Sequence, residues 1–114
     1  MENVVRTTPK NVTVRTAFVN PSTATTTQIV AAVAGKSYVV VAAFAMSTIA
    51  NNINFAGGTS GALSATLPLG ANGGIVLPYN EHGWFRTVAN EALQVVTSAA
   101  TATGVQVYYV ELTN

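Results

Sequence analysis

Short runs of β-branched and aromatic residues, separated by turn residues about every ten positions, constrain this chain most. Such spacing is typical of the strands of a sandwich or a barrel. The expected strands are Val12–Val19, Thr25–Val33, Tyr38–Ser47, Asn51–Ala56, Ala62–Leu67, Ile75–Leu77, Trp84–Val88, Ala92–Ala99 and Val105–Leu112. No segment has a convincing helical period. We therefore predict an all-β fold, a jelly-roll-like sandwich or barrel of about eight to nine short antiparallel strands.

Two of these runs suggest where the sheets are covered. Tyr38–Ser47 is the longest apolar run, which predicts a central strand buried on both faces. In Val105–Leu112 both alternating faces are largely apolar, so this strand should lie under another sheet or form an interface.

Turn residues suggest local reversals between the strands. Ala34-Gly35-Lys36-Ser37 and the Asn72-Gly73 pair are expected to close tight hairpins, because glycine and asparagine tolerate positive φ. Asn90 is a good N-cap, so one helical turn after it is an alternative to a strand.

Domain organisation follows from length and local composition. At 114 residues the chain is one domain, with residues 1–11 as an extended N-terminal arm and residues 12–114 as a single β domain. Arg6 and Lys10 in the arm, with Arg15 just inside the first strand, are candidate contacts to a protein partner. A frayed terminus without a role is the alternative.

The small number of charged residues bears most directly on function. Only 8% of the residues are charged, against about 25% in ordinary domains, while 49% are hydrophobic. Monomers normally cover their surface with charge, which keeps them apart in solution. We therefore expect this chain to bury outer surface against copies of itself or another protein.

Several other classes of function are disfavoured. The chain has no cysteine, which excludes disulfides and cysteine zinc sites. Its few cations form no basic stripe, so we expect no nucleic-acid partner. The unbroken apolar run from Tyr38 is too short to span a membrane. Met1 to Asn20 lacks the apolar run of a secretory signal, so we expect no secretion; synthesis in a host bacterial cytoplasm is what the resemblance described below implies.

Catalytic motifs are weak. Lys36-Ser37 ends like a phosphate-binding loop, but the first glycine of that motif is missing, since position 30 is Val. His82 is the single histidine and follows Glu81, so the two side chains are expected to point apart. We predict no enzyme activity, no metal and no cofactor.

One turn-rich segment concentrates the residue types that dominate protein interfaces. It contains Tyr79, His82, Trp84 and Phe85. Trp84 and Phe85 are adjacent, so one ring should enter the core and the other should face a contact. All four residues are candidate interface residues.

The segments GGIVLPYNEHGWFRTVANEALQVVTSAA and QIVAAVAGKSYVVVAAFAMS resemble blocks in small virion proteins of tailed bacteriophages, and the likeness extends over residues 28–112. These proteins are similar to capsid cement or decoration proteins, many of which are trimers. The resemblance implies a homotrimer on the outer capsid surface, with the major capsid protein of the shell as its partner. It supplies no catalytic residue.

The leading hypothesis is therefore a virion structural protein that binds and stabilises the capsid. A phage tail or fibre component is the alternative in the same class. A carbohydrate-binding jelly-roll module is an alternative from another class, with Tyr79, Asn80 and Trp84 as its binding residues. A hydrolase is the most distant alternative.

Overall fold

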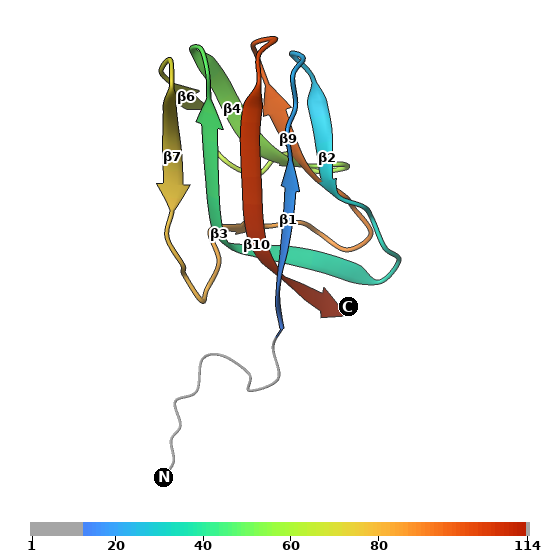
Figure 1. Cartoon of the computed structure of the whole chain (residues 1–114). Helices are drawn as coiled ribbons and strands as arrows, with labels where there is room; N and C mark the ends of the chain where they lie inside the picture. Colours follow the sequence, from blue (N-terminus) through green and yellow to red (C-terminus); the bar gives the residue numbers. More distant parts are fainter. Residues whose placement is uncertain (1–12, 114) are drawn as a thin grey trace.

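The computed structural model describes residues 13–113, which form ten strands and no helix. All strand pairs are antiparallel, and the strands make two five-stranded sheets that face each other as the layers of a sandwich (Figure 1). This confirms the predicted fold class. The expected N-terminal arm, with Arg6 and Lys10, lies outside the described residues.

Sheet A has the strand order β1-β10-β3-β7, and β8 also pairs with β3. Its strands are β1 (Val14–Val19), β3 (Lys36–Ser47), β7 (Gly73–Leu77), β8 (Phe85–Arg86) and β10 (Thr103–Thr113). Sheet B has the order β2-β9-β4-β5, and β6 also pairs with β4. Its strands are β2 (Thr26–Val30), β4 (Asn51–Gly57), β5 (Gly61–Ala62), β6 (Leu67–Leu69) and β9 (Leu93–Thr97).

The strand pairing is nested. The first strand pairs with the last, and each later strand of the first half of the chain pairs with an earlier strand of the second half. β1 pairs with β10, β2 with β9, β3 with β7 and β8, and β4 with β5 and β6. Because β7 and β8 share the partner β3, and β5 and β6 share the partner β4, this pairing corresponds to the eight-stranded arrangement of a jelly roll.

Two expected hairpins are wrong, and the nested pairing explains why. The segment Ala34–Ser37 joins β2 of sheet B to β3 of sheet A, and the segment around Asn72 joins β6 of sheet B to β7 of sheet A. Gly35 and Asn72 do have positive φ, at 76° and 56°. The turn residues were therefore identified correctly, but each turn carries the chain across the sandwich.

Three further expectations differ from the structure. The run Ala62–Leu67 is not one strand, since β5 ends at Ala62 and β6 begins at Leu67. No helical turn follows Asn90, which has a φ of 70°, outside the helical range. In β3 only the first half is buried on both faces, because the outer side of sheet A is uncovered from Phe44 onward.

The core lies between the two sheets and consists of inward-facing side chains from both. Its buried members are Tyr38, Val40, Ala43, Ala45, Ile53, Phe55, Leu69, Leu93, Val95, Val105 and Val107. None of the described residues lies in a helix that is long and apolar enough to cross a membrane.

Candidate protein-binding surface

The outer face of sheet A carries a row of large apolar side chains. The strand register places Phe18 beside Gln106, Gln106 beside Phe44, and Phe44 beside Val76, so these residues form one row across the sheet. We call this row the ridge. Phe18 is 67% exposed, Phe44 38% and Val76 71%. Exposed large apolar side chains that gather on one face make it a candidate interaction surface.

The next row on the same face has two glycines beside Met46, whose side chain is 58% exposed. It contains Gly104, Met46 and Gly74, which the register also places side by side, and we call it the furrow. A Cβ atom on Gly74 would lie 2.5 Å from the carbonyl oxygen of Ala45, so the backbone requires glycine there. Gly104 has no such constraint, since a Cβ would meet only Asn20, at 3.6 Å.

The missing side chains leave hollows in the surface. One, of about 150 Å³, lies over Gly104 between Phe18, Phe44 and Met46. A second, of about 380 Å³, continues from Gly104 and Met46 toward Thr48 and Asn72 at the end of the sandwich. The face therefore has hollows around Gly104, while Met46 of the same row is exposed.

Polar groups on this face already have partners within the chain. The Nε2 of Gln106 donates hydrogen bonds to the hydroxyl of Tyr108 at 2.9 Å and to Oγ1 of Thr16 at 3.2 Å. The hydroxyl of Thr16 donates in turn to the carbonyl of Val107 at 3.3 Å. Because these donors are satisfied internally, covering the face would not leave them unpaired.

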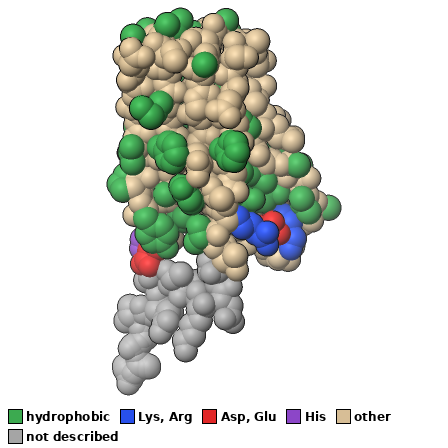
Figure 2. Space-filling view, in the orientation of Figure 1, with side chains coloured by type: hydrophobic (Ala, Val, Ile, Leu, Met, Phe, Trp, Pro, Cys, Tyr) green, Lys and Arg blue, Asp and Glu red, His purple; other side chains and the backbone are tan. Residues whose placement is uncertain are grey.

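Charge is confined to other parts of the described surface and interior. The ionised side chains of residues 13–113, histidine aside, belong to Arg15, Lys36, Glu81, Arg86, Glu91 and Glu111. None of them is in the ridge or the furrow. Figure 2 shows this face, with separate hydrophobic side chains across its middle and with the visible charge near its lower end. The ridge and the furrow together form an uncharged, half-apolar surface.

The four candidate residues from the aromatic segment lie in or next to the connection between β7 and β8. Phe85 is half-buried, and its ring stacks on that of Phe55 with centroids 5.0 Å apart. Trp84 is 42% exposed, and its Nε1 donates to the carbonyl of Pro78 at 2.7 Å. One ring therefore packs against the core, as expected, and the other is partly exposed, so the contact expected for Trp84 stays a prediction. Tyr79 is also exposed.

Trp84 and Phe85 border a cleft of about 390 Å³ at the open edge of the sandwich. The rest of its lining is mostly apolar and comes from Leu63, Ala65, Leu67 and Leu77, with Ser64.

The remaining candidates are separate from this cleft. The expectation for Glu81 and His82 is wrong, because the two side chains approach each other: Oε2 of Glu81 lies 3.7 Å from Nε2 of His82. Adjacent residues in an exposed loop are not held to the alternation of a strand, and opposite charges attract when the histidine is protonated. Arg15 is on β1, and β10 and β3 lie between it and β8, so the structure does not bring Arg15 to the aromatic residues.

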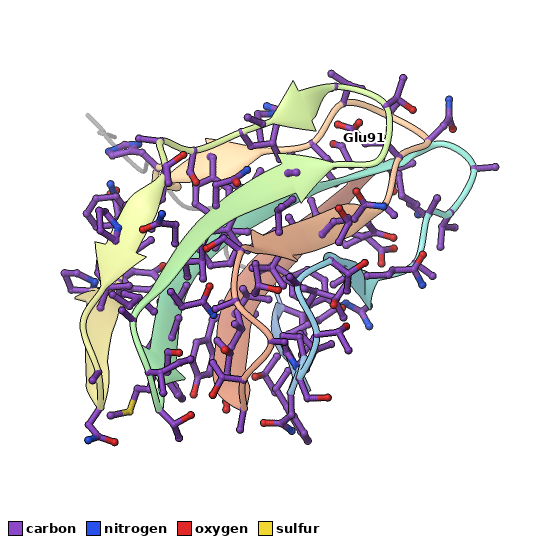
Figure 3. The ribbon with its side chains drawn as sticks, turned by 90° about the horizontal axis from the view of Figure 1, so that it is seen from above. Glu91 is labelled. Carbon is purple, nitrogen blue, oxygen red and sulfur yellow. The ribbon has the colours of Figure 1, made fainter. Side chains whose placement is uncertain are left out.

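The sequence pattern did not single out Glu91, a buried residue that holds two loops of the fold together. It is 1% exposed and lies between the turn that follows β4 and the loop that precedes β9 (Figure 3). Its Oε1 accepts hydrogen bonds from the backbone N–H groups of Thr59 and Ser60, at 2.8 and 2.7 Å. Its Oε2 accepts from the N–H of Val88 at 2.8 Å and from the hydroxyl of Ser60 at 2.9 Å.

These four donors decide the protonation state of Glu91. Burial favours the neutral acid and raises the pKa, but the hydrogen bonds from Ser60, Val88 and Thr59 stabilise the carboxylate and outweigh it. The net pKa therefore lies below the usual value. A carboxylate that is buried, ionised and fully hydrogen-bonded is a clamp between two loops and is not a proton acceptor for a substrate.

The described residues contain no evident reaction centre. No three residues of the types His, Cys, Asp and Glu come together within residues 13–113 to hold a metal ion. Ser60 donates to Glu91, while His82 lies in another loop beside Glu81. The most distinctive feature of the described surface is the exposed, uncharged row of Phe18, Phe44 and Val76.

Comparison with known proteins yields distant similarities in structure. Neither a protein-family model nor a curated protein matches the chain. A solved structure of the disulfide-linked pili described as Bacillus endospore appendages is 18% identical, with a TM-score of 0.44 and 98% of both chains covered. The EclA C-terminal domain, a sugar-binding protein, is 18% identical with a TM-score of 0.42, over 94% of this chain and 79% of that one.

A third similar structure is the virus-like particle of the giant freshwater prawn Macrobrachium rosenbergii extra small virus. It is 8% identical, with a TM-score of 0.45, and covers 97% of this chain and 85% of that chain. With TM-scores below 0.5, these three similarities carry no argument about the function of this protein.

Proposed function

We propose that this chain is a structural protein whose function is to bind other protein subunits through the outer face of sheet A. The observation that carries the proposal is the ridge of Phe18, Phe44 and Val76, a row of exposed side chains that contains no charged residue. Exposed aromatic and aliphatic side chains stabilise a complex when they leave water, at about 25 cal/mol per Å² of apolar area. The ridge contains no charged side chain that would have to lose its water when a partner covers it.

In its specific form the proposal is a capsid decoration protein of a tailed phage, as the resemblance of residues 28–112 implies. Such a protein stabilises an assembled shell by mass action, because it binds the assembled state and not the free subunits. A tail or fibre component would use the same kind of surface.

The carbohydrate-binding alternative receives less support from the structure. Asn80 was its candidate for hydrogen bonding to a sugar, but its Oδ1 accepts from the N–H of His82 at 3.0 Å. Its backbone N–H and C=O are used as well, with Val41 and Gly83. Tyr79 and Trp84 remain exposed, but the amide oxygen of Asn80, which would bind a sugar hydroxyl, already accepts a hydrogen bond within its own loop.

The test is a pelleting assay with purified, empty, expanded tailed-phage capsids. The wild-type chain should sediment with the shells, and the Phe18→Lys variant should show at least a tenfold weaker binding. Phe18 is solvent-exposed in the free chain, so the variant should remain folded. Val33→Lys is the matched control. Like Phe18, Val33 is an exposed apolar residue, but it lies between β2 and β3, outside the ridge. Equal pelleting of all three proteins would contradict the proposal.

A further inference from the structure

The cleft beside Trp84 lies at the edge of sheet A that is opposite β1, and none of the ridge residues lines it. Within residues 13–113, β7 and β8 pair with β3 alone, while β5 and β6 pair with β4 alone. Both sheets therefore end at this side of the sandwich. Uncovered sheet edges pair readily with other chains, and proteins protect them by covering them with another segment.

The lining of the cleft selects an apolar occupant. Its polar side chain, Ser64, is already paired, since its hydroxyl accepts from the N–H of Phe55 at 2.9 Å and donates to the carbonyl of Ala65 at 3.0 Å. The indole N–H of Trp84 is likewise used by the carbonyl of Pro78. A polar ligand would find no free side-chain donor in this lining, whereas aliphatic side chains would leave water beside leucines and two aromatic rings.

The strand register places the start of β1 within reach of this cleft. One row of the sheet runs from Val14 of β1 through Val110 and Val39 to Arg86 of β8. Three strand spacings of about 4.8 Å make this row roughly 14 Å long. The start of β8 borders the cleft, so the first strand of the chain begins about one sheet width away from it.

The segment that precedes β1 has both the length and the side chains to fill the cleft. Residues 1–12 lie outside the described residues, and their one adjacent apolar pair is Val4 and Val5. Val5 is nine positions before Val14, and nine residues of extended chain span up to about 30 Å. This is about twice the length of the row, which leaves enough chain to turn from β1 to the cleft. A segment tethered so close competes well against a second copy, because its effective concentration is in the millimolar range.

From these observations we infer that the chain's own N-terminal segment, residues 1–12, binds in the cleft beside Trp84, with Val4 and Val5 as its anchors. The segment then covers the open edge of the sandwich. This inference does not depend on the proposed function, because the ridge lies on another part of sheet A. It also differs from the contact to a protein partner that Arg6 and Lys10 suggest.

The first arm of the test uses the fluorescence of Trp84, the single tryptophan of the chain. In the full chain, Val4→Asp/Val5→Asp should shift the emission to the red and raise acrylamide quenching roughly twofold, because an occupied pocket hides most of its surface from solvent. The matched control is Thr7→Asp/Thr8→Asp, which adds the same charge to the same segment but removes no apolar side chain. Its emission and quenching should equal those of the wild type. Equal quenching in all three proteins, or an equal rise in both variants, would overturn the inference.

The second arm locates the segment and identifies the copy that supplies it. The chain has no cysteine, so Val5→Cys combined with Ala65→Cys, in the lining of the cleft, introduces one defined pair. A disulfide requires Cα atoms within about 7 Å, so mild oxidation should link this pair and give a product with the mass of one chain. Val5→Cys with Thr26→Cys is the control and should remain unlinked, because Thr26 is an exposed residue of β2 at the far edge of sheet B.

Two results of the oxidation would overturn the inference. A linked product with the mass of two chains would show that the segment of another copy fills the cleft. No more linkage at Ala65 than at Thr26 would show that residues 1–12 do not occupy it.

Discussion

At the level of single residues, the carboxylate of Glu91 joins two loops that are far apart in sequence. It collects four donors from the 59–60 turn and from position 88. Gly57 lies against it, and a Cβ at that position would overlap the carboxylate group. Charged groups tolerate burial when each acceptor site is filled, and become costly when one partner is removed.

The Glu91→Gln variant should therefore be destabilised. The amide places an NH₂ group where one carboxylate oxygen accepted two hydrogen bonds, which leaves donors facing donors. We expect a loss of about 2–4 kcal/mol in the free energy of unfolding, measured by urea titration at neutral pH. Glu81→Gln, in an exposed loop, is the control and should change it by less than about 0.5 kcal/mol.

The same residue predicts a pH dependence. Burial raises the pKa of Glu91, but its hydrogen bonds lower the pKa by more, so the folded pKa lies below the unfolded value of about 4.3. Its stabilisation is therefore complete above the unfolded pKa and is lost as the pH falls through the folded pKa. Urea midpoints should decline with acidification below about pH 4.3 in the wild-type protein and decline less in Glu91→Gln. Parallel declines in both proteins would contradict this role.

Trp84 and Phe85 should respond differently to replacement by alanine. Phe85 stacks on the buried ring of Phe55, so Phe85→Ala should cost about 3 kcal/mol through the cavity that it leaves. Trp84 is 42% exposed and lies outside the core, so Trp84→Ala should cost less, roughly 1 kcal/mol. Thermal unfolding of the two variants measures the difference, and equal losses would mean that both rings support the core.

At the scale of elements, Asn51 at the start of β4 holds the turn between β9 and β10. Its Oδ1 accepts from the N–H groups of Ser98 and Ala99, both at 3.0 Å, and its Nδ2 donates to Thr103 at 2.9 Å. This buried amide links a strand of sheet B to the turn through which the chain returns to sheet A.

Replacing Asn51 by Ala should loosen this turn. The free energy of unfolding should fall by about 2–3 kcal/mol, because buried donors lose their acceptor. Amide hydrogen exchange at Ser98 and Ala99 should accelerate more than exchange in β3. Asn52→Ala, at an exposed neighbouring position, should leave both measurements nearly unchanged.

For the whole molecule, the position of the few charged residues determines how salt should affect its association with other proteins. Lys36 and Glu111 lie 3.6 Å apart where β3 begins and β10 approaches its end, away from the ridge. An association through the uncharged face should be nearly independent of salt, because only charged contacts are screened. The dissociation constant of the chain from the capsid should change by less than roughly threefold between ~0.05 and ~0.5 M NaCl. A steep weakening with salt would assign the contact to the charged end.

Local patterns in the sequence determined the type of fold and most of its elements. β-branched runs and turn residues predict strands because they describe the backbone of a few neighbouring residues. The expected runs at Tyr38–Ser47 and Asn51–Ala56 differ from β3 and β4 by only a few residues. The low charge content likewise indicated a surface made for contact, and the adjacency of Trp84 and Phe85 required that one ring face outward.

The tertiary structure decided what depends on partners distant in sequence. Gly35 and Asn72 specify positive φ, but pairing with other strands determines that each turn crosses between sheets. The four donors of Glu91 come from two loops, and no local signal connects them. The ridge takes Phe18, Phe44 and Val76 from three strands, and only the register aligns them. A strand pattern tells which residues share a face, whereas long-range hydrogen bonding decides which faces become one surface.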